Sequence, residues 1–343
     1  MQRKNDLTGK PTLMKELNIG LIKDALAKNQ TATRVELSAM TQISQPTVNV
    51  LIRQLLEEEV VVSLGMAKST GGRKAEVYAL NTGRNRILSV IAESRGFRYV
   101  LTNLELKEEA RGEIICDPKK SYKEQLCSFI KKILQENKYI EALVVGVPGA
   151  VTSSGEVFDI PQIPEWEHFR LEDFLEQELV IPVKVMNDIN ATAVGYAGSA
   201  LARLKNMVYL YLGNPGIGAG IIVDGKLYSG CKSFSGEIGH MRLDGNDTVE
   251  KQLEGNPNEA ARTELFEKIV TNFICILNPE KIVIGGEVSK EMYEAIRNGC
   301  QKQLPSEILP EFEWIQPGQA ERYYFAGLGE TGKELLDQEV RLA

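Results

Sequence analysis

The chain has 343 residues, of which 43% are hydrophobic and 25% charged, and its net charge is −7. This length predicts two or three domains, because a single hydrophobic core rarely grows beyond about 250–300 residues. No apolar run approaches the ~20 residues of a membrane span. The first ten residues, MQRKNDLTGK, lack the apolar core of an export signal. We therefore expect a cytoplasmic protein.

The cysteines argue against a disulfide framework and against a metal site. They are odd in number and scattered, at Cys116, Cys127, Cys231, Cys275 and Cys300. Such a pattern is typical of reduced thiols. No CxxC occurs, and no cysteine lies at metal-ligand spacing from His168 or His240. The sequence predicts neither a bound metal nor another cofactor.

The charge is unevenly distributed along the chain. Residues 1–80 carry a net charge of +3, and the remaining residues carry −10. A positive segment on an acidic chain indicates contact with a polyanion. A chance fluctuation over eighty residues would give the same difference, so charge alone does not decide.

Three short helices are expected in this first segment. Residues 15–29 place Leu17, Leu21, Ile22 and Ala25 on one face, and Asn29 ends the helix. Residues 33–41 open with Thr33 and Glu36 at capping-box spacing. In the third helix Ser44 is the expected N-cap and Pro46 stands in the first turn. Its buried stripe consists of Val48, Leu51, Ile52, Leu55 and Leu56.

The second and third helices are joined by only three residues, QIS. This is the helix-turn-helix arrangement, in which the second helix enters the major groove of DNA with its N-terminus first. Side chains that reach bases and phosphates fall outside the buried stripe, at Gln45, Thr47, Asn49 and Arg53.

A β-ribbon follows the third helix. The strand-like segments VVVSL and EVYAL flank GMAKSTGGRKA, which holds Lys68, Arg73 and Lys74 and no acid. Such a basic wing suits phosphates or the minor groove. The alternative is a small helical domain with a basic hairpin for protein contact. Helix order, wing and charge together favour DNA binding.

The rest of the chain repeats one order of elements. ILSVIA, FRYVLTNL and GEIIC predict three antiparallel strands, followed by a helix in YKEQLCSFIKKILQEN and a buried strand in ALVVGVPG. VKVM is a strand that leads into a helix in ATAVGYAGSALARL. The strands MVYLYLG, AGIIVDG and KIVIGG partly repeat this set after residue 206. The pattern predicts two α/β lobes around a cleft.

The segment GNPGIGAGIIVDGKLYSG contains Gly-x-Gly-x-Gly but does not open a helix. A dinucleotide-binding fingerprint must open one, whereas here a β-branched strand follows. The glycines either bring backbone N–H groups to a phosphate or form a tight hairpin. Spacing alone favours neither.

Two polar constellations stand out in the body of the chain. Asp188 follows a predicted strand, at the sheet edge that faces the ligand crevice in α/β proteins, and either contacts a ligand or caps the next helix. Asn187 and Asn190 flank it. In SGEIGHM, Glu237 stands three residues before His240, which is a candidate metal ligand, catalytic base or ligand contact.

These segments resemble the ROK family of repressors, open reading frames and sugar kinases. The resemblance runs through GGRKAEVYALN, VVGVPGAV, VMNDINATA, GIGAGIIVDGKLYSG, SGEIGHM and LNPEKIVIGGEV. It implies an α/β protein with a winged helix-turn-helix domain over residues 1–84 and a two-lobed actin-like, hexokinase-like (ribonuclease H-like) body over 85–343. Lobe one would span about 85–200 plus the C-terminal helix, and lobe two about 201–325.

The resemblance also implies a sugar site. In the family, an Asn-Asp pair and a Glu-x-x-His pair contact sugar hydroxyls, and the Asp is the catalytic base of the kinases. The matching positions here are Asn187, Asp188, Glu237 and His240, joined by Gly149. Carboxylates accept hydrogen bonds from hydroxyls, and amide and imidazole N–H groups donate them.

The chain departs from the family at the phosphate loops and the zinc segment. The first loop, AESRGFR, lacks the paired glycines of the family, and Glu93 stands where the family has Asp. Arg95 and Phe97 are expected to crowd the phosphates of a nucleotide. The second loop keeps Gly216 and Gly218 but gains a residue. No cysteine follows His240. Glu250 or Glu254 is a candidate for a lost sugar-contacting Glu, and Gln162 stands where the family often has Asn.

We therefore expect a sugar-responsive transcriptional regulator, a repressor of carbohydrate-use genes that binds its sugar without phosphorylating it. Its partners would be an operator in double-stranded DNA, a sugar or sugar-phosphate effector and further copies of the chain in a homodimer or homotetramer. The alternative is a sugar kinase that also binds DNA. A third hypothesis is a body that has lost ligand binding and only oligomerises.

Overall fold

The computed structural model describes residues 10–66, 75–81, 85–199, 204–213 and 216–342. It divides into two compact units. The first comprises the chain up to Arg86 with the short segments 103–105 and 335–343, and the second comprises 87–102 and 106–334. The predicted wing residues Lys68, Arg73 and Lys74 lie outside the described residues.

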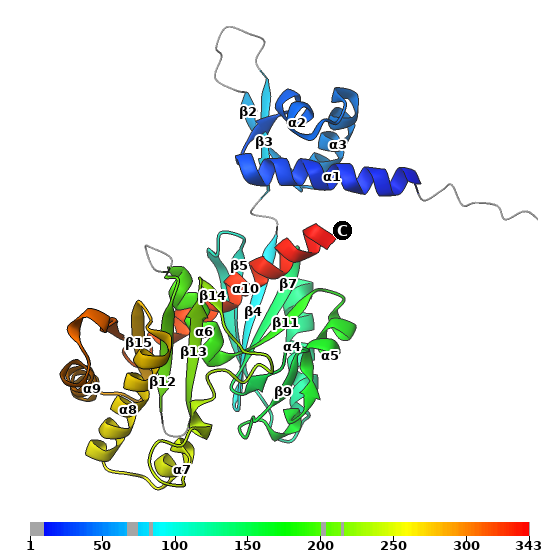
Figure 1. Cartoon of the computed structure of the whole chain (residues 1–343). Coiled ribbons are helices and arrows are strands. Elements are labelled where there is room, and N and C mark those ends of the chain that lie inside the picture. Colours follow the sequence, from blue (N-terminus) through cyan, green and yellow to red (C-terminus); the bar gives the residue numbers. More distant parts are fainter. Residues whose placement is uncertain (1–9, 67–74, 82–84, 200–203, 214–215, 343) are drawn as a thin grey trace, which may run out of the picture. The chain divides into compact units, whose positions relative to one another are not determined.

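Up to Arg86, the described residues of the first unit form three helices and a small antiparallel sheet (Figure 1). The helices are α1 (Lys10–Asn29), α2 (Arg34–Thr41) and α3 (Gln45–Glu57). The strands are β1 (Ala32–Thr33), β2 (Val61–Met66) and β3 (Glu76–Leu80), in the order β1-β3-β2. The stripe predicted on α3 faces the core of this unit, where Ile22, Leu37 and Tyr78 are fully buried.

The predicted start of α2 is confirmed, and that of α3 in part. Thr33 Oγ1 accepts a hydrogen bond from Glu36 N at 3.3 Å, and Glu36 Oε2 accepts from Thr33 N at 2.7 Å, which completes the capping box. Ser44 is the N-cap residue of α3, but its hydroxyl pairs with the Thr47 hydroxyl at 2.9 Å and caps no backbone N–H group.

The predicted apolar face of α1 was wrong in part. Ile22 and Ala25 are buried together with Leu26, one position further along. Leu17 and Leu21 are about half exposed, at 48% and 46%. The core contacts a narrow arc centred on Ile22, Ala25 and Leu26, and the two leucines fall at its edge.

Where the structure describes the second unit, its two large sheets have five strands each and related topology. The first has the order β11-β7-β4-β5-β6 and the second the order β14-β13-β12-β15-β16. Each combines an antiparallel hairpin with parallel pairing, such as β11 with β7 and β12 with β15. The strands of the first sheet are β4 (Arg86–Glu93), β5 (Gly96–Asn103), β6 (Glu108–Ile115), β7 (Ile140–Val147) and β11 (Val183–Asn187). Those of the second are β12 (Met207–Leu212), β13 (Ile217–Val223), β14 (Lys226–Leu227), β15 (Lys281–Gly286) and β16 (Glu311–Trp314). The two predicted α/β lobes are thereby confirmed.

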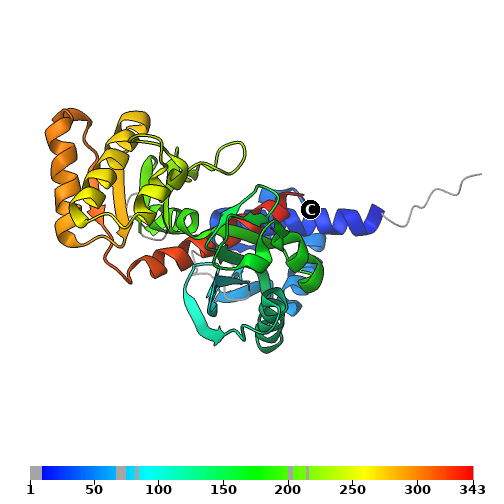
Figure 2. The same cartoon turned by 90° about the horizontal axis from the view of Figure 1, so that it is seen from below.

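Helices cover both faces of these sheets. α4 (Tyr122–Glu136) and α5 (Leu171–Leu179) pack on the outer face of the first sheet, and α8 (Glu259–Leu277) and α9 (Lys290–Gln303) on that of the second. α6 (Asp188–Ser199) and α10 (Ala320–Leu342) lie between the two sheets, as both views show (Figures 1 and 2). No helix in the described ranges is long and apolar enough to cross a membrane.

Short elements complete the second unit. A three-stranded sheet joins β8 (Ala150–Val151), β9 (Glu156–Phe158) and β10 (Phe169–Arg170). The 3-10 helices are η1 (Pro164–Trp166), η2 (Ile238–His240) and η3 (Ser306–Ile308), and α7 (Val249–Glu254) is a short α-helix after η2.

Candidate functional site

A cavity of about 370 Å³ lies between the two lobes of the second unit. Lobe one contributes the segment after β7, the segment after β9 and the start of α6. Lobe two contributes the end of β12 with its following turn, η2 and α7. Five of the predicted sugar-site residues line this cavity: Gly149, Asn187, Asp188, Glu237 and His240. The topology therefore brings together two motifs that stand about fifty residues apart in the chain.

Asn187 and Asp188 are held in place by the start of α6. Asn187 Oδ1 accepts the Asn190 N–H at 3.0 Å, and its Nδ2 donates to Gly149 O and to Asp188 Oδ1, both at 3.1 Å. Asp188 Oδ1 also accepts the Ile189 N–H at 2.8 Å. Asp188 contacts the helix start through Oδ1 and also lines the cavity, so this geometry is compatible with both alternatives.

Burial raises the pKa of Asp188 to about 6, although the Ile189 N–H group acts in the opposite direction. A carboxyl group with such a pKa exchanges its proton near neutral pH. The largest cause of the raised pKa is desolvation, and the negative charge of Glu93 adds a smaller contribution in the same direction.

His240 faces lobe one across the cavity. Its Nε2 atom lies 3.6 Å from Asp159 Oδ2, and its ring centroid lies 5.2 Å from that of Phe234. The side chain is 49% exposed, so it is not a buried histidine satisfied by backbone. Glu237, three residues earlier, is more buried. Burial raises its pKa to about 7, with Asp159 as the next contribution.

The structure adds cavity residues that the sequence did not point to. Asp159, in the segment between β9 and η1, and Tyr211, near the end of β12, both line the cavity. Tyr211 precedes the glycine turn, and Asp159 begins a turn-rich segment, so each had only a weak signal. Gln162, Glu250 and Glu254, named as uncertain candidates, lie there as well.

The segment after His240 does not fit the zinc site of the family. It contains no cysteine, and α7 and the start of α8 occupy it. In the described part of the chain no three His, Cys, Asp or Glu side chains are grouped to hold a metal ion. The metal-ligating side-chain types that line the cavity with His240 are carboxylates, which are not the donor set of a structural zinc site.

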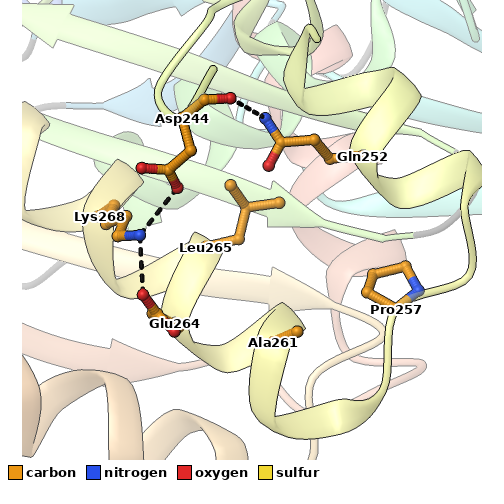
Figure 3. Close-up of a pocket in the computed structure, with 7 residues that line it drawn as sticks. All are labelled: Asp244, Gln252, Pro257, Ala261, Glu264, Leu265 and Lys268. Carbon is orange, nitrogen blue, oxygen red and sulfur yellow. Dashed lines mark hydrogen bonds and ion pairs between the residues drawn. The ribbon is translucent and has the colours of Figure 1, made fainter. Parts of the chain in front are cut away.

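A second, smaller hollow of about 170 Å³ lies beside α8 (Figure 3). Lys268 bridges Asp244 and Glu264 there at 2.8 Å each, and Gln252 donates to the Asp244 carbonyl. These groups satisfy one another and hold the loop before α7 against α8. We assign this hollow a structural role.

The turn at the position of the first phosphate loop is closed by ion pairs. β4 ends at Glu93 and β5 begins at Gly96, so only two residues join them. Arg98 binds Glu93 at 2.6 Å and also pairs with Glu321 of α10. Its guanidinium therefore links the hairpin to the C-terminal helix.

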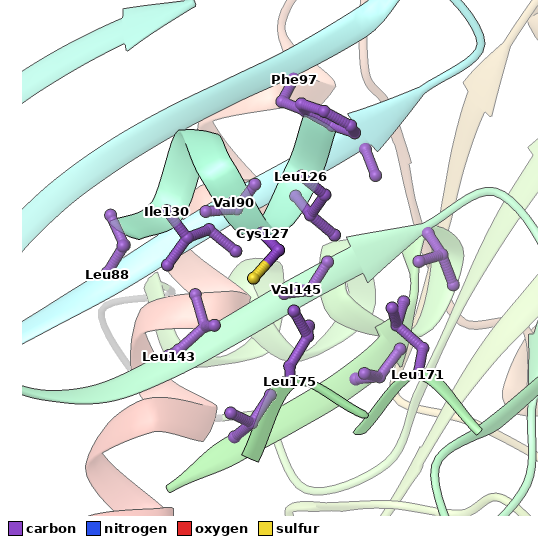
Figure 4. Packing of buried hydrophobic residues seen from close by; sticks show 14 of the residues in the cluster. Leu88, Val90, Phe97, Leu126, Cys127, Ile130, Leu143, Val145, Leu171 and Leu175 are labelled. Atoms are coloured by element: carbon purple, nitrogen blue, oxygen red, sulfur yellow. The ribbon is translucent and has the colours of Figure 1, made fainter. Parts of the chain in front are cut away.

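The prediction that Phe97 crowds the phosphates was wrong. Phe97 is 1% exposed and faces the core of lobe one, with Leu126 of α4 among its neighbours in the cluster (Figure 4). Side chains alternate along a strand, so Arg98 rather than Phe97 points to the opposite face. Arg95 is exposed in the turn.

Tyr324 of α10 packs against the end of β7. A Cβ atom at Gly146 would lie 2.2 Å from Tyr324 Oη and 2.5 Å from Cε2, so the ring occupies the space next to this backbone. Its hydroxyl is buried without a partner among the described residues. Tyr324 and the Arg98–Glu321 ion pair thus join α10 to strands β7 and β5 of the first sheet.

The glycine segment is a hairpin, and its glycines serve packing. Gly213 N donates to Gly216 O at 3.0 Å between β12 and β13. A Cβ at Gly218 would lie 2.4 Å from Ile189 Cδ1, and one at Gly220 would lie 2.4 Å from Ala193 Cβ. Only glycine lets β13 approach α6 so closely. Gly216 lines the cavity.

In the first unit, α3 presents a polar surface. Gln45, Asn49 and Arg53 are exposed and Thr47 is half-buried, and all four lie outside the buried stripe. The turn before α3 is fixed by Ser38 Oγ, which donates to Ile43 O at 2.6 Å. This is the arrangement in which a helix can enter the major groove.

The family model "ROK family" matches residues 94–261. This chain belongs to the ROK family. Among curated ROK relatives, the xylose repressor of Caldicellulosiruptor bescii is 29% identical over 276 residues, which cover 76% of this chain and 69% of that protein. A putative xylose repressor of Caldicellulosiruptor sp. is 30% identical over 70% of this chain and 62% of its own length. The chain therefore spans about two thirds of the length of these relatives.

Longer alignments and solved structures agree on the fold. The DNA-binding transcriptional repressor Mlc of Escherichia coli is 23% identical over 85% of this chain and 87% of its own length. A crystal structure of a ROK family transcriptional regulator, a homologue of that protein, superposes with a TM-score of 0.67, 18% identity and coverage of 96% and 99%. The ROK hexokinase of Thermus thermophilus superposes with a TM-score of 0.61 and 18% identity, over 74% of this chain and 99% of its own. The hexokinase thus matches less of this chain than the regulator does.

Proposed function

We propose that this ROK family member is a transcriptional repressor that binds operator DNA through α3 and a sugar in the interlobe cleft. The observation that carries the proposal is the presence, in one chain, of an exposed polar helix after a tight turn and of a cleft lined by Asn187, Asp188, Glu237 and His240. The names of the curated relatives support it, since they are repressors.

The sugar would bind through hydrogen bonds from both lobes. Asp188 and Glu237 accept bonds from hydroxyl groups, and the His240 imidazole and the Asn187 amide supply N–H donors. Tyr211 offers an apolar ring face with a polar tip to the same cavity. A ligand held by both lobes stabilises one closure of the cleft, and such a preference is what alters operator affinity.

The chain would not phosphorylate its sugar. Phosphoryl transfer depends on positioning and charge stabilisation at the phosphates. Here Arg98, on the strand that follows this turn, is bound to two carboxylates, and Tyr324 packs against Gly146 of the neighbouring strand β7. One feature favours a kinase: Asp188 lies where the kinases of the family have their base, and burial raises its pKa to about 6.

Two assays separate these functions. DNA selected from a random pool on the purified protein is titrated with and without xylose, glucose and N-acetylglucosamine. We expect sequence-selective binding that one neutral sugar alters, with two recognition helices on a palindromic site in a homodimer or homotetramer. In a coupled assay with ATP, turnover of any sugar at ~1 s⁻¹ or faster would refute the repressor-only proposal.

A further inference from the structure

The interlobe cavity has an unbalanced set of charges. Five carboxyl groups line it: Asp159, Asp188, Glu237, Glu250 and Glu254. They face a single imidazole, that of His240. Among the described residues that line the cavity there is no lysine and no arginine. The opening therefore presents one sign of charge to a ligand.

Two of these acids belong to α7, which stands where the family has its zinc segment. Val249 and Leu253 of α7 are buried in the core of lobe two, and Thr248 Oγ1 caps the helix by accepting from Lys251 N at 3.3 Å. Glu250 and Glu254 are one helical turn apart, so they lie on the same face of α7. Val249 and Leu253 directly precede these two residues, so their burial fixes α7 with Glu250 and Glu254 at the cavity.

The carboxyl groups act on one another. Besides burial, Asp159, Asp188 and Glu250 all raise the pKa of Glu237, and only His240 lowers it. Charges of one sign in a cleft with low-dielectric walls produce a focused field. A ligand with a phosphate or carboxylate would meet the same repulsion, and like charges brought together at a binding site suppress binding.

We propose that α7 makes this cleft selective by charge: it admits uncharged and ammonium-bearing sugars and excludes sugar phosphates and sugar acids. The inference rests on the proposed function, in which the cleft binds a sugar. It narrows the effector class expected from the sequence, which included sugar phosphates. Glu250 and Glu254 are the specificity-determining residues.

The hydrogen-bonding groups agree with this selection. Ionised carboxylates only accept hydrogen bonds, so they suit hydroxyl and ammonium donors. Phosphate oxygens are also acceptors and would leave the carboxylates unpaired. Anion sites in proteins are built from Arg, Lys or helix N-termini, and no Arg or Lys of the described residues lines the cavity.

The test compares matched ligands of different charge. Full-length protein is titrated by calorimetry and thermal shift, at low salt, with glucose, mannose, galactose, xylose and N-acetylglucosamine. Each sugar is compared with its own amine, 6-phosphate and uronic acid derivatives, wherever that derivative exists. The titrations are repeated with Glu250→Gln/Glu254→Gln. A control, Glu259→Gln/Glu291→Gln, removes the same charge from exposed first-turn positions of α8 and α9 outside the cavity.

We expect the sugar that binds to lose at least about tenfold in affinity when it carries a phosphate or carboxylate. Raising the salt to about 1 M should reduce this difference, because the Debye length falls to about 3 Å. The ratio of dissociation constants, charged derivative over parent sugar, should fall at least about threefold in Glu250→Gln/Glu254→Gln. The control should leave this ratio unchanged.

Three results would overturn the inference. A phosphate or uronate that binds as tightly as its parent sugar would refute charge selection and leave the sugar-binding function standing. A ratio unchanged in Glu250→Gln/Glu254→Gln would remove α7 as its source. If no compound of any charge bound, the proposed sugar-binding function would fail and this inference with it.

Discussion

His240 and Asp159 face each other across the cleft, with 3.6 Å between Nε2 of the imidazole and Oδ2 of the carboxylate. Asp159 belongs to lobe one and His240 to lobe two, so the pair is a polar contact between lobes. Both side chains are about half exposed, at 54% and 49%. A ligand hydroxyl can therefore replace either partner without leaving a buried group unpaired.

His240→Ala and Asp188→Ala should each abolish the effect of the sugar on operator binding and leave sugar-free binding near normal. Each removes a contact from one lobe, so the sugar no longer favours one closure of the cleft. The coupling lost is typically about 1–3 kcal/mol, or a roughly 5–150-fold change in operator affinity. Operator titrations with and without the sugar measure it.

The matched control is His168→Ala. His168 is the other histidine of the chain, and it pairs with Glu156 and Glu167 on the surface, with 73% of its side chain exposed. This variant should respond to sugar like the natural chain. A folded His240→Ala protein with an unchanged response at the same sugar concentration would refute the ligand contact.

Glu237→Gln should reduce the loss of stability as pH rises from 5 to 8. The folded-state pKa of Glu237, about 7, lies above its ordinary value of 4.5, so the native state binds more protons than the unfolded state in this window. The contribution of Glu237 to the free energy of unfolding is therefore fully present below pH 4.5 and is lost as the pH rises through about 7. Given partial solvent screening, we expect on the order of 1–2 kcal/mol. Urea unfolding at several pH values gives this slope.

Glu291→Gln provides the comparison, because Glu291 is an exposed residue in the first turn of α9. It should keep the slope of the natural chain. Asp188, whose pKa is raised to about 6, contributes a slope of the same sign that persists in Glu237→Gln. An identical slope in Glu237→Gln and Glu291→Gln would contradict the assignment.

Gly146→Ala should destabilise the second unit by about 1–3 kcal/mol, as overpacking a core does. The new methyl group would collide with the ring of Tyr324, which α10 holds in place. Gly198→Ala in α6 is the control. Its Cβ would meet Glu330 only at ordinary contact distance, 3.6 Å, so it should be neutral or stabilise by up to about 1 kcal/mol. Thermal unfolding compares the two variants. Equal unfolding midpoints would show that the Tyr324 side chain moves aside without cost.

In the DNA-binding unit, Asn49→Ala and Arg53→Ala should act differently. Loss of an Asn contact with a base edge changes which sequences are selected, whereas loss of an Arg contact with a phosphate lowers the salt slope by about one. Arg73→Ala, in the predicted wing, should resemble Arg53→Ala. Lys302→Ala, exposed on α9 in the other unit, is the control. If Asn49→Ala left base preference unchanged, α3 would not read bases.

Local patterns predicted most of the fold. The Thr33 capping box, the apolar stripe of α3 and the two sets of strands depend on residues close in sequence, and each is present as expected. The face of α1 was harder, because Leu17 and Leu21 fit the helical period as well as Leu26 does. Only the contacts of the folded unit decide which arc is buried.

The site was predictable where two motifs supply it and not where single residues do. The spacing that identifies a motif can be read directly from the sequence for Asn187-Asp188 and Glu237-x-x-His240. Asp159 reaches the cavity only because β9 and η1 place it opposite η2, and no local pattern encodes that. The error at Phe97 was avoidable, since strand alternation puts Phe97 and Arg98 on opposite faces.

The close packing of β13 on α6 restricts how the cleft can move. α6 begins at Asp188, at the end of a lobe-one strand, yet Ile189 and Ala193 of α6 fill the spaces that Gly218 and Gly220 leave on the lobe-two sheet. Pulling the lobes apart would expose this interface, whereas rotation about the axis of α6 preserves it. We expect α6 to be the pivot of cleft closure. A ligand bound at Asp188 then lies close to the pivot. For the same rotation, the contact that His240 makes moves farther than the contact at Asp188.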